Sequence, residues 1–495
     1  MVALVAILVS IYNLENFRQG INSSTLRIGH TPATLYSQAD ADGAFIIVAH
    51  GFAGSRQLMQ AYSLSLANAG YRVIAFDFEG HGRNPVPMSG DVTAIDGTTR
   101  LLVDETRRVI ARARELDVNS TGIVLLGHSM ATDVLVRAAM AEEDAGKAID
   151  TIVGISMFSE AVTASFPASL LVINGQWEGR LRSPALRQLQ LVDRNAKEGD
   201  TARNEGVVRR VIAAPGVEHV SVLFSMTAVN EALAWIDSVY ARQSSPVVAS
   251  PGIWILLLLA GIVLLLRPLI QWLPANGLPT KGLPTNADYQ QALPRRTFLL
   301  AVILPAVLTP WLALLPDIGF LPVLVADYLM LHLLVFAAVQ LVVIRPRLSC
   351  SLSTSVVAAL LLAFWGIIVF GLALDRYAAS FLPTAGRLLI VSVLSIGTVL
   401  FMFSDSVVTE NGRGLLWRRM VARLTLILSL LAAAFLDAER LIFLLLILPV
   451  LMLFYLVHGL MGRWVARRCG PCAAGAGLGL CLAWALGVSF PLFDG

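Results

Sequence analysis

Charged residues are scarce in this chain, and cysteine is missing from its first half. Only 14% of the 495 residues are charged and 56% are hydrophobic, whereas about a quarter of an average soluble protein is charged. The cysteines all lie in the second half, at Cys350, Cys469, Cys472 and Cys481. Disulfide bonds therefore do not hold the first half together, and it is compatible with either redox compartment.

Net charge is also small. The formal net charge is +3, and the basic residues do not gather with aromatic residues into a patch. We therefore expect no nucleic-acid partner, and we assign no cofactor and no metal site. Cys469 and Cys472 have the spacing of a redox or metal pair, but no strand and helix of a thioredoxin-like unit flank them. We interpret this segment as the start of a helix at a membrane edge.

The composition divides the chain into two parts. Most of the aspartate and glutamate lies before Gln243, and from Pro251 onward apolar runs alternate with short loops that carry arginine. This change predicts an α/β domain over residues 24–243 and a multi-pass transmembrane domain over residues 252–492. Residues 1–14 are apolar but shorter than the about 20 residues that a span needs. We interpret them as an N-terminal membrane anchor, with an export signal or an interfacial segment as the alternatives.

Strand-like and helical patterns alternate in the first part. Such alternation predicts a mostly parallel sheet with helices on both faces. The expected strands are residues 45–49, 72–76, 122–126, 151–155, 170–173 and 208–212. The expected helices between and after them are residues 55–69, 99–116, 131–143, 183–195 and 220–242.

A strand-like run meets a helical run at the sequence Gly-His-Ser-Met-Ala, residues 127–131. A serine at the apex of such a turn stands above the C-terminal edge of a parallel sheet, and small residues two before and two after it keep the turn free of clashes. Ala131 occupies the position at which glycine is common. The pattern is typical of a nucleophile elbow, and it makes Ser129 the candidate nucleophile.

Two further segments follow expected strands: His-Gly-Phe-Ala-Gly-Ser at residues 50–55, and Asp-Phe-Glu-Gly-His-Gly-Arg-Asn at residues 77–84. Together with the elbow, they make the chain resemble the α/β-hydrolase superfamily, in the branch of lid-poor esterases and acyl-peptidases. The resemblance covers roughly residues 24–243. It implies an oxyanion hole formed by the backbone N–H groups of Phe52 and Met130, and a structural role for His81.

The resemblance also implies the chain order serine, acid, histidine. His219 is the histidine of the first part that follows Ser129 at a useful distance, and it lies in a loop between an expected strand and an expected helix. Glu178 follows the expected strand at 170–173, where the family usually has aspartate. Glu160, after the preceding strand, is the alternative acid. We therefore expect catalysis by Ser129, Glu178 and His219.

The second part contains about eight apolar runs long enough to span a membrane. Lysine and arginine gather in alternate loops, around Lys281, Arg345, Arg413 and Arg467, while the loops between them are near neutral. Because cytoplasmic loops carry the excess of basic residues, the Lys281 loop is predicted to be cytoplasmic. The hydrolase domain would then lie outside a bacterial-type plasma membrane.

Two functions fit these features. The first is a membrane-embedded serine hydrolase that cleaves an ester, thioester or amide, with a small-molecule or lipid acyl substrate and with membrane lipids around it. The alternative is a membrane transport or sensing protein whose α/β domain binds a ligand without catalysis. No protein partner is assigned. Residues 156–169 are too few to form a helical lid, so either another part of the chain, such as the membrane domain, covers the site or the site stays open.

Overall fold

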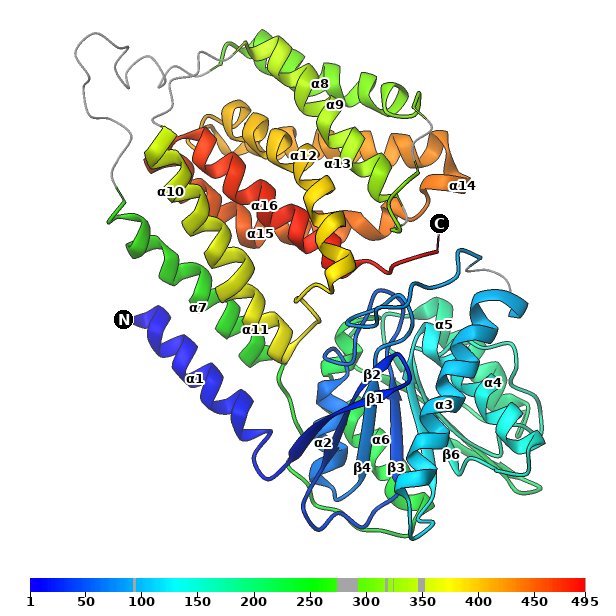
Figure 1. Cartoon of the computed structure of the whole chain (residues 1–495). Coiled ribbons are helices and arrows are strands. Elements are labelled where there is room, and N and C mark those ends of the chain that lie inside the picture. Colours follow the sequence, from blue (N-terminus) through cyan, green and yellow to red (C-terminus); the bar gives the residue numbers. More distant parts are fainter. Residues whose placement is uncertain (92–94, 274–292, 317–318, 324, 346–351, 495) are drawn as a thin grey trace.

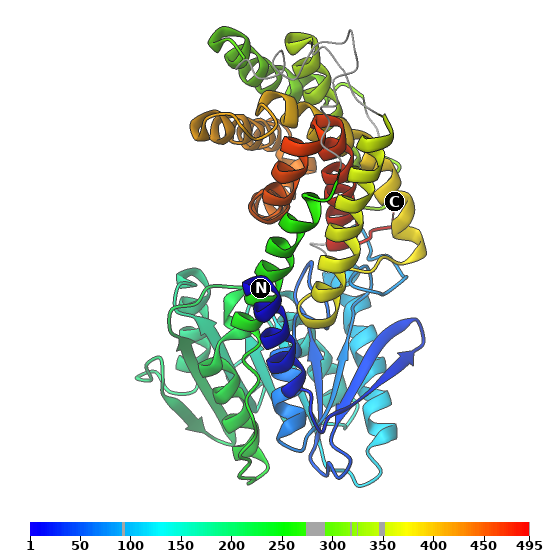
Figure 2. The same ribbon diagram turned by 90° about the vertical axis from the view of Figure 1, so that its left-hand side faces the viewer.

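A computed structural model describes residues 1–91, 95–273, 293–316, 319–323, 325–345 and 352–494. It consists of an α/β domain and a helical bundle, stacked so that one end of the sheet faces the helices (Figures 1 and 2). The α/β domain followed by an all-helical part confirms the predicted fold class.

A nine-stranded sheet forms the centre of the α/β domain, in the order β1-β2-β4-β3-β5-β6-β7-β9-β8. Strands β3, β4, β5, β6, β7 and β9 pair in parallel, and β1, β2 and β8 pair antiparallel at the two ends of the sheet. The bounds are β1 Asn22–Ile28, β2 Thr31–Ser37, β3 Phe45–Ala49, β4 Arg72–Phe76, β5 Ile123–His128, β6 Thr151–Ile155, β7 Ser169–Gly175, β8 Thr201–Asn204 and β9 Val207–Ala214.

Helices cover both faces of the sheet, which is why the central strands are apolar along their whole length. The apolar side chains of α3, α4 and α5 pack with one face. Those of α2 and α6 pack with the other. Their bounds are α2 Gln60–Asn68, α3 Arg100–Leu116, α4 Met130–Asp144, α5 Gly179–Gln190 and α6 Met226–Val239.

The observed α2 is shorter than the helix predicted from residue 55. The chain from Ser55 to Gln60 forms hydrogen-bonded turns, in which the N–H of Leu58 donates to the carbonyl of Ser55. The helix α6 likewise begins at Met226, because the hydroxyl of Ser225 accepts the N–H of Ala228 and caps its first turn. The preceding predicted stretch holds a separate short 3-10 helix, Ser221–Phe224.

Within the described residues, eight helices of the second part are long and apolar enough to cross a membrane, the number predicted. They are α7 Gly252–Ile270, α8 Arg295–Leu312, α9 Ala326–Ile344, the continuous α10–α11 stretch Ser355–Tyr377, α12 Ala385–Val408, α13 Leu416–Leu436, α15 Leu444–Cys469 and α16 Pro471–Ser489. A short helix, α14 Ala438–Leu441, precedes α15. The Lys281 loop lies outside the described residues.

Helix α16 lies in the middle of the bundle, and its glycines let α12 approach closely. A Cβ added to Gly479 would lie 2.4 Å from the Cα of Val399, and one added to Gly475 would lie 2.5 Å from the Cα of Phe403. Small residues at such spacing are the usual means by which membrane helices pack backbone to backbone. The glycines of this segment are therefore explained by packing.

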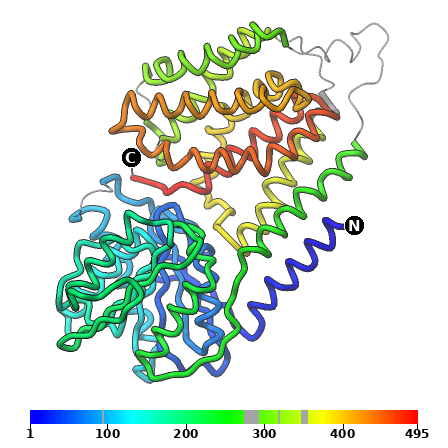
Figure 3. Tube along the Cα trace, turned by 180° about the vertical axis from the view of Figure 1, so that it is seen from behind, coloured from blue at the N-terminus to red at the C-terminus, as the bar shows by residue number. Residues whose placement is uncertain are grey.

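The apolar N-terminus forms α1, Val2–Asn16. It runs beside α7 (Figure 3), and a Cβ added to Gly261 of α7 would lie 2.8 Å from a side-chain carbon of Ile7. With 15 residues, α1 is shorter than the eight candidate spans. Its last turn is tied to the bundle, because Glu15 forms a two-pronged ion pair with Arg376 at the end of α11.

Candidate active site

Ser129 occupies a strained turn between β5 and α4. Its backbone angles are φ 52° and ψ −119°, a conformation that residues other than glycine rarely adopt. A Cβ on Gly127 would lie 2.6 Å from the Cδ1 of Leu135 and 3.1 Å from the Cβ of Ala131. The turn therefore accepts alanine at position 131 because position 127 carries no side chain.

The structure brings Ser129, His219 and Glu178 together at the C-terminal edge of the sheet. The Nε2 of His219 lies 2.9 Å from the Oγ of Ser129, and its Nδ1 lies 2.6 Å from the Oε1 of Glu178. These residues follow β5, β9 and β7. The side chain of His219 is 41% exposed and that of Glu178 is 5% exposed, so the imidazole is open to solvent on one side while the carboxylate is enclosed.

Glu178 is held from several directions. Its Oε2 accepts hydrogen bonds from the Oγ of Ser156 at 2.8 Å and from the N–H of Gly175 at 2.5 Å. Burial by itself raises the pKa of the Glu178 carboxyl, but the hydrogen bonds from His219, Gly175 and Ser156 outweigh burial and lower it. The carboxylate is thus kept ionised opposite the imidazole.

The alternative acid takes no part in this arrangement. Glu160 is solvent-exposed, and within the described residues no hydrogen bond or ion pair joins it to His219. The geometry favours Glu178.

The loop after β3 lies directly against the elbow. A Cβ on Gly51 would be 2.9 Å from the Nδ1 of His128 and 3.0 Å from the Cβ of Ser129, so only glycine allows this approach. Among the described residues, neither the N–H of Phe52 nor that of Met130 donates a hydrogen bond. Phe52 follows the glycine that lies against the serine, and Met130 follows the serine itself. Neither donor of the predicted oxyanion hole has an acceptor among the described residues.

His128 was not predicted to take part in the site, although it immediately precedes the nucleophile. Its Nε2 lies 2.8 Å from the carbonyl oxygen of His219, and the two rings lie 4.8 Å apart. Burial lowers the pKa of His128 to about 4. The neutral imidazole therefore holds the backbone of His219 in place. Ser156, which contacts Glu178, was also missed, because nothing in the sequence around it indicates where its hydroxyl points.

His81 lies beside the site without facing Ser129. It is 1% exposed, and burial lowers its pKa to about 3. Its Nδ1 lies 2.8 Å from the carbonyl of Glu79, and its ring packs edge to face with that of Phe52 at 5.6 Å. These contacts give it the structural position that the resemblance implied.

Comparison with known proteins identifies the family that the α/β domain resembles. Residues 40–260 match the family described as "Serine aminopeptidase, S33". None of the curated proteins matches this chain significantly. Residues 40–260 therefore belong to the α/β-hydrolase superfamily, as the resemblance predicted.

Several solved structures are similar to the same part. TT1662 from Thermus thermophilus is 15% identical over 45% of this chain and 99% of its own, with a TM-score of 0.35. A soluble variant of monoglyceride lipase from Saccharomyces cerevisiae is 11% identical over 45% of this chain and 96% of its own, with a TM-score of 0.33. An esterase/lipase from an uncultured bacterium is 10% identical over 45% of this chain and 86% of its own, with a TM-score of 0.33.

Proposed function

We propose that this chain is a membrane-embedded serine hydrolase that cleaves an ester, thioester or amide through an acyl-enzyme. The observation that carries the proposal is the continuous hydrogen-bonded line from Ser129 through His219 to the enclosed carboxylate of Glu178. A serine hydroxyl is a weak nucleophile, and an adjacent base that is itself oriented by a carboxylate activates it.

In the proposed mechanism, the Oγ of Ser129 attacks the acyl carbon while the Nε2 of His219 takes the hydroxyl proton. Glu178 stabilises the imidazolium and keeps it oriented. The N–H groups of Phe52 and Met130 stabilise the negative charge that develops on the carbonyl oxygen. His219 then gives the proton to the leaving group, and a water molecule activated by the same imidazole releases the acyl group from the serine.

The position of the site favours an acyl substrate that comes from the membrane. The edge of the sheet that carries the three residues faces the helical bundle (Figure 1). The eight candidate helices of that bundle are long and apolar enough to span a bilayer. A lipid or a lipid-linked ester could therefore reach Ser129 without leaving the membrane surface. We accordingly propose lipids as the neighbours and lipid acyl groups as candidate substrates.

The proposed orientation puts the hydrolase domain outside the cytoplasm. Arg387, near the start of α12, donates a hydrogen bond to the carbonyl of Gly80 in the α/β domain. Arg413, in the turn after α12, and Arg467, in the last turn of α15 and not in a loop as predicted, lie beyond the opposite end of α12, where Arg413 donates to the carbonyl of Arg467. Because basic loops stay in the cytoplasm, this arrangement supports an extracytoplasmic hydrolase domain.

Labelling of the full-length chain in detergent with a fluorophosphonate probe tests the proposal. We expect wild type to be labelled and Ser129→Ala to lose both labelling and the hydrolysis of short p-nitrophenyl esters. Ser183→Ala, which changes an exposed serine of α5, is the matched control and should behave as wild type. A folded wild-type protein that is neither labelled nor hydrolytic would favour the ligand-binding alternative. Full activity in Ser129→Ala would refute the assigned nucleophile.

A further inference from the structure

The side chain of Phe52 contacts the helical bundle. Its ring lies 5.9 Å from that of Phe443, between α14 and α15, and 6.5 Å from that of Phe493, near the C-terminus. These three rings, with Val325 and Phe490, line a small apolar cavity between the two parts of the protein. The residue whose N–H we assign to the oxyanion hole is therefore anchored by side chains that are far away in the sequence.

Phe493 is itself held in place by the α/β domain. On either side of it, the N–H of Leu492 donates to the carbonyl of Gly80 at 2.8 Å, and the N–H of Asp494 donates to the carbonyl of Met88 at 2.9 Å. Its own N–H donates to Pro322 of the bundle at 2.8 Å. The C-terminal segment is thus bound to both parts at once, and Phe493 is 4% exposed.

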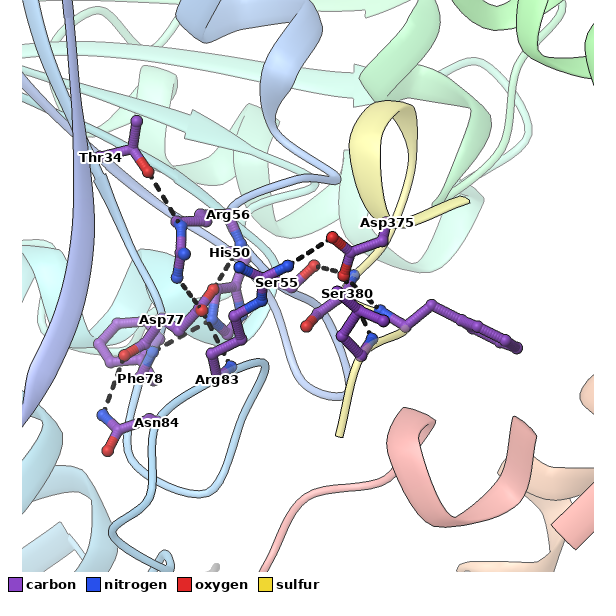
Figure 4. A network of polar contacts seen from close by, with 12 residues as sticks. Thr34, His50, Ser55, Arg56, Asp77, Phe78, Arg83, Asn84, Asp375 and Ser380 are labelled. Atoms are coloured by element: carbon purple, nitrogen blue, oxygen red, sulfur yellow. Dashed lines mark hydrogen bonds and ion pairs between the residues drawn. The ribbon is translucent and has the colours of Figure 1, made fainter. Parts of the chain in front are cut away.

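The loop between β3 and α2, which carries Phe52, contacts the bundle at a second point, Ser55. The N–H of Ser380, between α11 and α12, donates to the Oγ of Ser55 at 3.0 Å, and Arg83 forms an ion pair with Asp375 (Figure 4). Asp375 in turn accepts the N–H of Phe381 at 3.0 Å. The ring contacts at Phe52 and the hydrogen bond at Ser55 therefore connect this loop to the membrane domain at two points.

Within its own domain, the described contacts of the loop between these two points are few: the Phe52 ring packs on His81 at 5.6 Å. The N–H of Gly54 donates to the carbonyl of Gly51 at 3.0 Å, and Gly51 lies against the elbow. Oxyanion stabilisation depends on donors that are fixed within about 0.5 Å, and loss of one donor lowers kcat by about 100- to 1,000-fold. A shift of the bundle that moved the Phe52 ring would move the adjacent N–H as well.

We propose that the membrane domain positions the loop after β3, whose Phe52 N–H is assigned to the oxyanion hole, with Phe443 and Phe493 as positioning residues. Hydrolysis then depends on the contact between the bundle and this loop. This inference rests on the proposed hydrolase function. The bundle would thereby take the place of the helical lid that residues 156–169 are too few to form. Rearrangement of α12 or α15 would then change turnover without any change in Ser129, His219 or Glu178.

Kinetics of the full-length protein in detergent test the inference. For Phe493→Ala and Phe443→Ala, we expect kcat for a short p-nitrophenyl ester to fall about 10- to 100-fold, with KM changed less than about threefold. Affinity for an alkyl trifluoromethyl ketone, which forms an oxyanion on the serine, should fall in parallel with kcat. The conservative variant Phe493→Leu should recover most of the activity. Phe435→Ala, which changes an 84% exposed side chain of α13, is the matched control.

A milder variant covers the case in which the alanine substitutions prevent folding. Ser55→Ala removes only the acceptor of the Ser380 hydrogen bond, and we expect kcat to fall about three- to tenfold while the unfolding temperature falls by only a few degrees. Unchanged kcat in the folded variants, or a rise in KM alone, would overturn the inference. Ser129→Ala, assayed beside them, separates the two proposals: if it is inactive while the phenylalanine variants are normal, the hydrolase assignment stands and the coupling is wrong.

Discussion

The Nε2 of His128 lies 2.8 Å from the carbonyl oxygen of His219, so the residue before the candidate nucleophile holds the backbone of the candidate base. A carbonyl oxygen only accepts hydrogen bonds, and Nε2 must therefore carry the ring proton. Since burial lowers the pKa of His128 to about 4, the ring is neutral near pH 7. The elbow thus places both the serine and the loop that carries its partner.

Replacement of His128 tests this relationship. His128→Ala removes the donor to the loop, and we expect kcat to fall about tenfold, the effect of losing one hydrogen bond of about 1.4 kcal/mol. His128→Gln keeps an amide N–H near the same position and should retain more activity. Measurement of kcat for both variants tests whether His128 positions His219, and the unfolding temperature serves as a control for the cavity left by alanine. Equal kcat in the two variants and wild type would contradict the assigned role.

The acid can be identified by exchanging carboxylates for amides. Glu178→Gln should lower kcat by about 10²- to 10⁴-fold, because an amide no longer stabilises the imidazolium and can hold the ring in the wrong tautomer. Glu160→Gln should leave kcat unchanged, since that side chain is exposed. Both variants should keep the unfolding temperature close to that of wild type. The opposite pattern would make Glu160 the acid.

The central strands were predictable because they are short apolar runs bounded by turn residues. The predicted limits of β3, β4 and β6 agree with the structure. Strands β1, β2 and β8 were missed. The strand β1 is largely exposed and β8 is a four-residue polar segment, so neither has the apolar pattern of a buried strand. They become strands through pairing with their neighbours, which a local pattern does not reveal.

Only those site residues were predictable whose positions follow from the order of the strands in this fold. That order places a serine after β5 and a histidine after β9, and it makes Glu178 a candidate because the residue follows β7. The contacts of Ser156 and His128 depend on the path of the backbone; Ser156, for example, has a φ of 49°. The contact of Phe52 with Phe493 joins two residues that lie far apart in the sequence, and no pattern near either residue indicates it.

The orientation in the membrane can be measured with single cysteines in a background where the native cysteines are replaced by alanine. Val118→Cys, at an 85% exposed position of the α/β domain, should react with an impermeant thiol reagent added to intact cells. Lys281→Cys should react only after the membrane is opened, because basic loops are retained in the cytoplasm. Labelling of Lys281→Cys alone in intact cells would reverse the proposed topology.

The buried carboxyl of Glu105 should make stability depend on pH. It is 0% exposed, on α3, and it accepts hydrogen bonds from the N–H of Glu79 and the Nδ2 of Asn84, each at 2.9 Å. Burial raises its pKa from 4.5 to about 7. These hydrogen bonds fix the turn after β4 that meets the bundle. They favour the ionised carboxylate, but burial outweighs them, so the folded state favours the protonated carboxyl.

Because the folded-state pKa of Glu105 lies above the unfolded one, its contribution to stability is complete below about pH 4.5 and is lost as the pH rises through about 7. The difference corresponds to at most about 3 kcal/mol. We expect the unfolding temperature of the detergent-solubilised protein to fall between pH 5 and pH 8, and Glu105→Gln, which stays neutral, to flatten that fall. Glu143→Gln, at an exposed position of α4, is the matched control. An equal fall in Glu105→Gln and wild type would show that other groups cause the pH dependence.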